Sequence, residues 1–294
     1  MERLKRSEAW RRLVECPGLF LWVAAALNLA GCGGLDLLAP SMEDIVDRNR
    51  LHFEETDLAP SVLENRMKEI DDAYSEPRTP AKVEYSYETC VHSITRVNSY
   101  AALWRGARAC AWLSENHPDR SRKDEFALKG IAMGKEAVKK ISAIKDASSR
   151  PEPDYYLALC IANWADLHHP PASETLRRMK ELMSMALQFD ENYDYAGPHR
   201  FLGQLMVKTD PFPTYAVGSL KEGLEHLKKA TLLFPDYGEN HLIYAEALKE
   251  DGKNDLARAE LEKVIASARP QDRSTEHDAW LTRANEMLQD LQGK

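Results

Sequence analysis

The chain has 294 residues, 29% of them charged, and a formal net charge of −8 at pH 7. This charge repels phosphate backbones and no basic stripe interrupts it, which argues against nucleic-acid binding. Beyond an apolar amino-terminal segment about 260 residues remain, enough for a large core or a repeat array. None of them forms a second apolar run of membrane-spanning length.

The amino terminus has the pattern of a lipoprotein signal peptide over residues 1–31. Basic residues precede an apolar run, Leu19–Leu29, that is too short to span a bilayer but typical of a signal-peptide core. The run leads into Leu-Ala-Gly-Cys32, which resembles the lipobox of bacterial lipoproteins. We predict cleavage before Cys32, a lipid on its thiol, and a tether over residues 32–42. Gly33 follows the cysteine where an aspartate would indicate inner-membrane retention, so the outer membrane is favoured. The alternative is an ordinary secretory signal.

The rest of the chain is predicted to be all-α. Apolar residues recur at intervals of three and four, and helix-favouring residues dominate. One or two helices are expected within residues 43–80, and a tetratricopeptide-like helical repeat solenoid over residues 81–270. A capping helix is expected within residues 271–294. The apolar face of that helix would carry Trp280, Ala284, Met287, Leu288 and Leu291.

Four helix pairs are expected, each with small residues where its two helices cross. In the third pair, Gly203 and Ala230 would let the two backbones approach closely, and Pro235 would end the second helix. An insert over Thr209–Ser219 separates the helices of that pair, and Asp251-Gly252 forms the turn of the fourth. The first two pairs have longer predicted loops, over His117–Lys123 and His168–Ser173.

Cys90, Cys110 and Cys160 each lie in an apolar helical stretch, and their spacing is not that of a metal site. They are interpreted as small buried hydrophobes. One disulfide in an oxidising compartment is the alternative.

Four stretches carry a family resemblance: Tyr100–Arg108, Tyr156–Trp164, Gly197–Gly203 and Gly218–Tyr237. With the insert between the last two, they resemble the tetratricopeptide-type lipoproteins of tripartite ATP-independent periplasmic (TRAP) transporters, the T component, across residues 40–270. The resemblance implies a lipid-anchored periplasmic protein that partners the transporter's solute-binding protein and holds or passes small, often hydrophobic ligands. Pro198 departs from the pattern, because a second small residue is more usual there.

Candidate ligand-binding residues are aromatic or cationic. Aromatic side chains would line a small-molecule cavity or simply pack in the core; the candidates are Trp104, Tyr156, Trp164 and Phe201. Arginines would clamp a ligand carboxylate or pair with acidic neighbours; the candidates are Arg105, Arg108 and Arg200.

Other motifs carry weaker signals. Phe212 and Tyr215 in the insert would contact a partner, or the insert is a rigid loop with one buried aromatic. His168 and His169 are neighbours in a predicted loop and point apart, so no metal site is predicted. The segment Gly197–Arg200 would bind an anion or simply begin a helix.

No catalytic motif or cofactor-binding motif is present, so we expect a binding protein and not an enzyme. The leading hypothesis is an accessory protein of a TRAP system that docks a solute-binding protein and holds a small organic ligand, hydrophobic or acidic. The alternative is a generic scaffold lipoprotein for envelope protein assembly. The sequence leaves the oligomeric state open, including a homo-oligomer.

Overall fold

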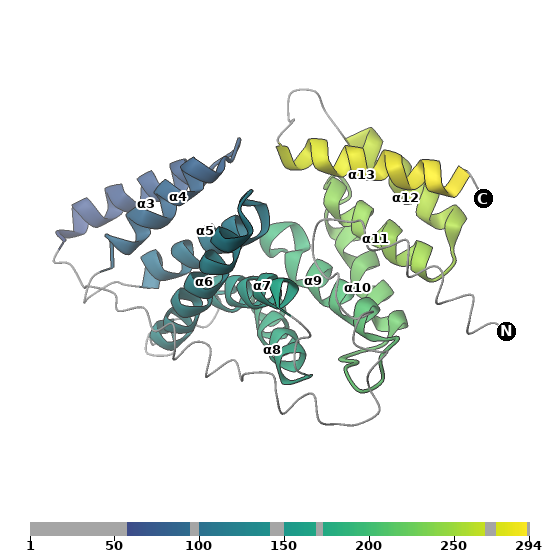
Figure 1. The fold of residues 1–294 in the computed structure, drawn as a ribbon, viewed down its shortest axis with the longest axis horizontal. Helices are drawn as coiled ribbons and strands as arrows, with labels where there is room; N and C mark the ends of the chain where they lie inside the picture. Colours follow the sequence, from purple (N-terminus) through teal and green to yellow (C-terminus); the bar gives the residue numbers. More distant parts are fainter. Residues whose placement is uncertain (1–57, 95–99, 142–149, 169–172, 268–274, 293–294) are drawn as a thin grey trace.

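The computed structural model describes residues 58–94, 100–141, 150–168, 173–267 and 275–292. These residues form eleven helices and no strand, and consecutive helices pack against each other (Figure 1). In chain order the helices are α3 (Pro60–Tyr74), α4 (Pro80–Val91), α5 (Tyr100–Asn116), α6 (Arg120–Ile141), α7 (Glu152–Leu167), α8 (Ser173–Phe189), α9 (Tyr193–Thr209), α10 (Leu220–Leu233), α11 (Gly238–Glu250), α12 (Asn254–Ser267) and α13 (Thr275–Gln292). The predicted all-α repeat fold is thereby confirmed. Cys32, the signal peptide and the tether lie outside the described residues.

Local sequence signals begin several of these helices. Ser219 and Glu222 form a reciprocal capping box at the start of α10, and the Thr79 hydroxyl accepts from the Lys82 N–H at the start of α4. The Asp119 carboxylate accepts from two backbone N–H groups at the start of α6. Because of this cap, α6 begins at residue 120 and the predicted loop over His117–Lys123 is shorter than expected. None of the helices in the described ranges is both long and apolar enough to cross a bilayer.

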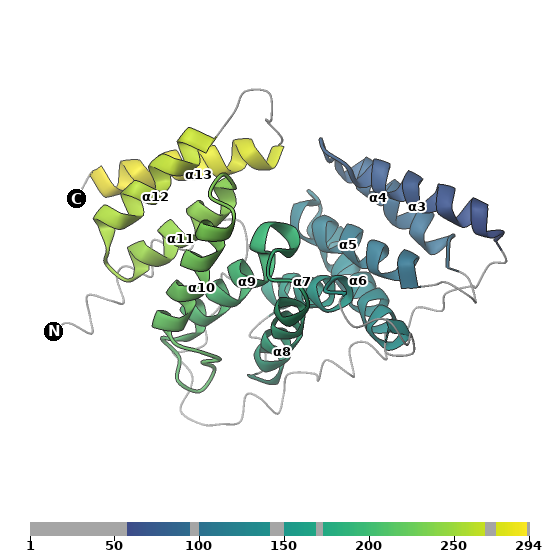
Figure 2. The ribbon, with the colours of Figure 1, turned by 180° about the vertical axis from the view of Figure 1, so that it is seen from behind.

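The helices follow an arc whose first and last members return toward each other (Figures 1 and 2). One large hydrophobic core runs through α3–α9, and a second lies among α11, α12 and α13. A small cluster of Val207, Leu227, Ile243 and Ala247 lies between them. As predicted, α13 covers the open end of the last pair with Trp280, Ala284, Met287, Leu288 and Leu291.

The crossing of α9 and α10 is close at Gly203, as predicted. Gly203 meets Gly223 of α10 there: a Cβ on Gly203 would lie 2.8 Å from the Gly223 carbonyl oxygen, and a Cβ on Gly223 would lie 2.8 Å from the Gly203 oxygen. Two backbones meet here, so neither can yield by rotating a side chain. Ala230 is fully buried one turn beyond Leu227.

We expect Gly203→Ala to destabilise the protein by about 2 kcal/mol, because a methyl group would force these two helices apart. For a chain of this size, the melting temperature should fall by roughly 4–8 °C. Gly238→Ala is the matched control, since the nearest atom to a Cβ there would be the Ser267 hydroxyl oxygen at 3.1 Å, which can rotate away, and Trp280 and Val264 would lie at ordinary contact distances of 3.6 and 3.8 Å. Thermal unfolding by circular dichroism measures both. Equal melting temperatures for the two variants would contradict the close crossing.

Candidate functional site

A closed circuit of contacts joins the first helix of every pair to α13. Each member touches the next through an ion pair, a hydrogen bond or a ring contact, apart from Trp280 and Glu276, which are joined by one turn of α13. We call this circuit the inner ring; in contact order it comprises Arg78, Tyr74, Arg108, Asp71, Arg105, Trp104, Tyr156, Tyr155, Asp194, Arg200, Tyr237, Trp280 and Glu276.

One segment of the inner ring is a carboxylate held between two arginines. Asp71 of α3 accepts from Arg105 Nη2 at 2.9 Å and from Arg108 Nη2 at 2.7 Å, both from α5. The Arg108 guanidinium also lies over the Tyr74 ring at 4.0 Å, and that of Arg105 lies over Trp104 at 4.2 Å. The structure therefore gives both arginines an acidic neighbour of the chain itself, which is the alternative to clamping a ligand carboxylate.

The charge of Asp71 is stabilised by this arrangement. Burial alone would raise the pKa of its carboxyl, but the hydrogen bond from Arg105 and the charge of Arg108 outweigh burial and lower it. A ligand carboxylate would therefore have to displace a firmly ionised partner before it could bind either guanidinium.

A cluster of aromatic rings continues the inner ring across α7. Trp104 stacks on Tyr156 with centroids 6.2 Å apart, and Tyr155 meets Tyr156 edge-on at 5.2 Å. Tyr193 donates from its hydroxyl to the Tyr156 hydroxyl at 3.1 Å. Trp104 and Tyr193 stay partly exposed, whereas the other two rings are buried. The cluster thus joins two partly exposed rings, Trp104 and Tyr193, to two buried tyrosines.

A strained turn carries the next segment. Asp194, Tyr195 and Ala196 have φ values of 48°, 55° and 62°, in the left-handed region that side-chain-bearing residues seldom adopt. Arg200 supports this turn by donating to the carbonyl oxygens of Asp194 and Tyr195 at 3.4 and 3.3 Å. Asn240 of α11 donates to the Tyr195 carbonyl oxygen at 3.0 Å. The regular part of α9 then starts at Gly197-Pro198, as expected for a helix start.

The same guanidinium is fully engaged by protein groups. Arg200 is only 7% exposed, donates to the Asn240 side-chain oxygen at 2.9 Å and pairs with Glu239 at 3.1 Å. Burial by itself would lower the pKa of Arg200, but the negative charge of Glu239 outweighs it and raises the pKa. Arg200 therefore stays charged and holds the turn, instead of facing a ligand.

The inner ring closes through Glu276 at the start of α13. Its carboxylate oxygen Oε1 accepts from Arg78 Nε at 2.9 Å and from the Trp112 indole N–H at 3.0 Å. Arg78 lies between α3 and α4, 198 residues away in the chain. We call this three-residue contact the closing contact; it joins the two ends of the arc seen in Figure 1.

The remaining predicted site residues lie apart from the inner ring. Trp164 is partly buried and stacks on His168 at 4.7 Å, and Phe201 is 4% exposed in the large core. Phe212 is 7% exposed, so it is a packing residue here, whereas Tyr215 is only partly buried and keeps surface for a partner. His168 contacts Asp124 at 2.5 Å, and His169 lies outside the described residues.

Sequence reasoning missed several members of the inner ring. Asp71, Tyr74 and Glu276 lie in helices that were assigned only to the flanks, and Asp194 lies in an unremarkable turn sequence. No local signal marks them, because each acquires its role from a partner far along the chain.

Cys90, Cys110 and Cys160 are buried free thiols, in agreement with the interpretation as small hydrophobes. Burial raises the pKa of the Cys90 thiol to about 12 and also raises those of Cys110 and Cys160. Within the described ranges, no group of three or more His, Cys, Asp or Glu residues is placed to hold a metal ion.

A comparison of the sequence with protein-family models, and another with curated proteins, found no match for this chain.

Proposed function

We propose that the protein is a lipid-anchored periplasmic accessory protein of a TRAP transport system, which docks a solute-binding protein and holds a small organic ligand inside the inner ring. The observation that supports this proposal is the inner ring itself. Six partly exposed aromatic side chains belong to the inner ring or contact one of its members. They come from five helices or the turns that precede them: Tyr74, Trp104, Trp112, Tyr193, Tyr237 and Trp280. Aromatic walls with a few polar groups suit small-molecule binding.

The neighbours of the arginines define the kind of ligand that we propose. Arg105 and Arg108 share Asp71, and Arg200 is paired with Glu239. Each of these guanidinium groups already pairs with a carboxylate of the chain, and only Arg108 Nε, among their nitrogens, is buried without an acceptor within the described residues. The site therefore favours a mostly apolar molecule that lies against the aromatic faces and meets the tyrosine hydroxyls. Of the two ligand classes expected from the sequence, the hydrophobic one therefore fits better than the organic acid.

Native mass spectrometry of the full protein purified from its own membrane tests ligand binding. We expect a co-purified small molecule whose occupancy falls at least tenfold in Trp104→Ala, because the indole is the broadest partly exposed face of the aromatic cluster. Trp164→Ala is the matched control, since that ring lies beside His168 and outside the inner ring. Absence of a ligand from the parent protein, or equal occupancy in both variants, would reject this part of the proposal.

The partner and the anchor need separate tests. Cross-linking in periplasm should capture a solute-binding protein of a TRAP system, whereas capture of envelope assembly factors would favour the scaffold alternative. In Cys32→Ala, the mass increment of the attached lipid should be absent from the mass spectrum, and the protein should leave the membrane fraction. A parent protein without lipid would reject the anchor while leaving the ligand proposal standing.

A further inference from the structure

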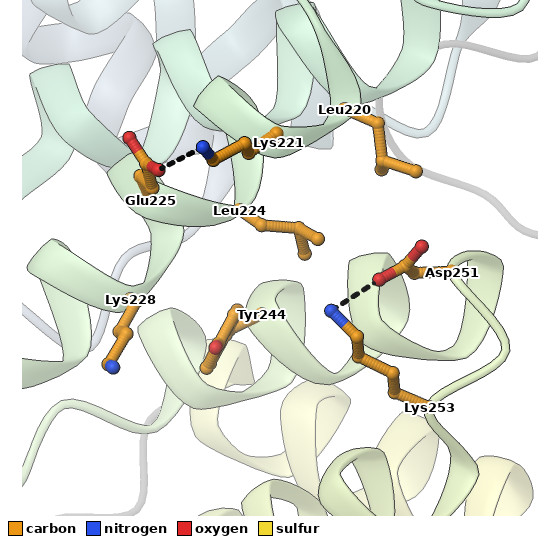
Figure 3. A pocket seen from close by; sticks show the side chains of 8 residues that line it. All are labelled: Leu220, Lys221, Leu224, Glu225, Lys228, Tyr244, Asp251 and Lys253. Carbon is orange, nitrogen blue, oxygen red and sulfur yellow. Dashed lines mark ion pairs between the residues drawn. The ribbon is translucent and has the colours of Figure 1, made fainter.

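A surface groove lies between α10 and the end of α11, apart from the inner ring. Its volume is about 420 Å³, and Figure 3 shows side chains from both helices and from the α11–α12 turn around it. Leu220, Leu224 and Tyr244 provide its apolar lining, and Lys221, Lys228 and Lys253 are its lysines.

The floor of the groove is apolar and anchored from below. Leu220, Leu224 and Tyr244 are partly exposed, and each packs against one or both of the hydrophobic clusters beneath it. Burial raises the pKa of the Tyr244 hydroxyl, so the ring stays neutral at physiological pH. A large apolar side chain entering the groove would meet a preformed surface.

The rim is basic, in contrast to the chain as a whole. Lys221 and Glu225 are 4.0 Å apart with side chains 87% and 67% exposed, and Lys253 pairs with Asp251 at 2.6 Å. Lys228 is exposed and makes no ion pair with any residue of the described part of the chain. The groove is therefore lined by three lysines and two carboxylates, an excess of positive charge in a protein whose net charge is −8.

We propose that this groove docks an acidic amphipathic segment of a partner protein, which inserts one large apolar side chain and places carboxylates beside the lysines. Charge complementarity is the reason for proposing an acidic partner, because an apolar patch with excess positive charge favours a segment that carries negative charge. A protein segment fits better than a small molecule, since lysines on flexible stems provide no rigid fork for a carboxylate. The inference holds whether or not the inner ring takes a ligand.

Fluorescence anisotropy with the full protein and labelled twelve-residue peptides tests the proposal. The probe peptide carries one phenylalanine among glutamates, and its control carries lysines in place of the glutamates. We expect the acidic peptide to bind, and its affinity should fall as the salt concentration rises. In the double variant Lys228→Glu, Lys253→Glu, its affinity should be at least tenfold lower than in the parent. Lys139→Glu is the control, because Lys139 is 75% exposed on α6, far from the groove in sequence.

Three results would overturn the proposal. Equal binding of both peptides would remove the charge argument. Displacement of the acidic peptide by decanoate at equal concentration would make the groove a small-molecule site. A dimer in sedimentation that Lys228→Glu dissociates would show that a second copy of the chain occupies it. Circular dichroism of each variant confirms that loss of binding is not loss of fold.

Discussion

Replacing Arg200 with methionine is expected to lower the melting temperature by roughly 6–20 °C. The guanidinium is buried, and its removal takes away the ion-pair partner of Glu239 and the Arg200 hydrogen bonds to the Asp194 and Tyr195 carbonyl oxygens, of which the Tyr195 oxygen keeps its bond from Asn240. Breaking a buried charge pair from one side costs about 3–5 kcal/mol, and each kcal/mol corresponds to roughly 2–4 °C in a chain of this size. Differential scanning calorimetry measures the effect.

Two further variants show whether geometry or charge is responsible. Arg200→Lys should recover only a minor part of the loss, because one ammonium group cannot reach both Glu239 and the Asn240 side chain as the planar fork does. Arg178→Met is the surface control; its pair with Glu181 is 3.3 Å long and exposed, so it should cost less than about 1 kcal/mol.

The near-ultraviolet spectrum provides a second measurement. Tyr195 stacks on Tyr237 with centroids 4.3 Å apart, and the turn that Arg200 supports holds this stack. The tyrosine circular dichroism signal should therefore weaken in Arg200→Met below its melting temperature. A variant that melts within about 2 °C of the parent and keeps its spectrum would show that the left-handed turn does not depend on this residue.

Loss of the closing contact is the second large expected effect. Glu276→Ala removes the carboxylate that accepts hydrogen bonds from Arg78 Nε and the Trp112 indole N–H. Loss of these partly buried, charged hydrogen bonds should destabilise the closed arrangement by about 2 kcal/mol. The population with separated ends should then rise roughly 30-fold. Spin labels on Ala81→Cys and Ala279→Cys, both exposed, should show a longer and broader distance distribution.

The controls separate opening from unfolding. The cap itself should stay folded, because Ala284, Met287 and Leu291 pack on α11 and α12 without the closing contact. Glu286→Ala, which removes a 61% exposed carboxylate from the same helix, should leave the distances unchanged. Identical distributions in Glu276→Ala and the parent would show that the two ends are held by other contacts.

The closing contact should also weaken in acid. Burial alone would raise the pKa of Glu276, but the Trp112 hydrogen bond and the Arg78 charge outweigh burial and lower it. A lowered pKa means that the contact is present above the ordinary glutamate value and is lost as pH falls through the lowered one. The labelled parent should therefore stay closed at neutral pH and open only well below pH 4.5.

Several features of this protein follow from its sequence alone. The three- and four-residue spacing of apolar side chains determines which face of each helix is buried, so the paired helices and the packing face of α13 were predictable. Gly252 adopts φ of 76° in the turn between α11 and α12, which its Asp-Gly sequence indicated. These properties depend on neighbours within a few residues.

Only the tertiary structure decided the inner ring. The partners of Arg105 and Arg78 lie 34 and 198 residues away, and the curvature of the arc brings them together. The pattern of small residues predicted a close crossing at Gly203, and the packing of α9 on α10 set Gly223 as the glycine that meets it. Periodicity encodes which side of a helix is buried, whereas the identity of a distant partner depends on how all the intervening helices pack.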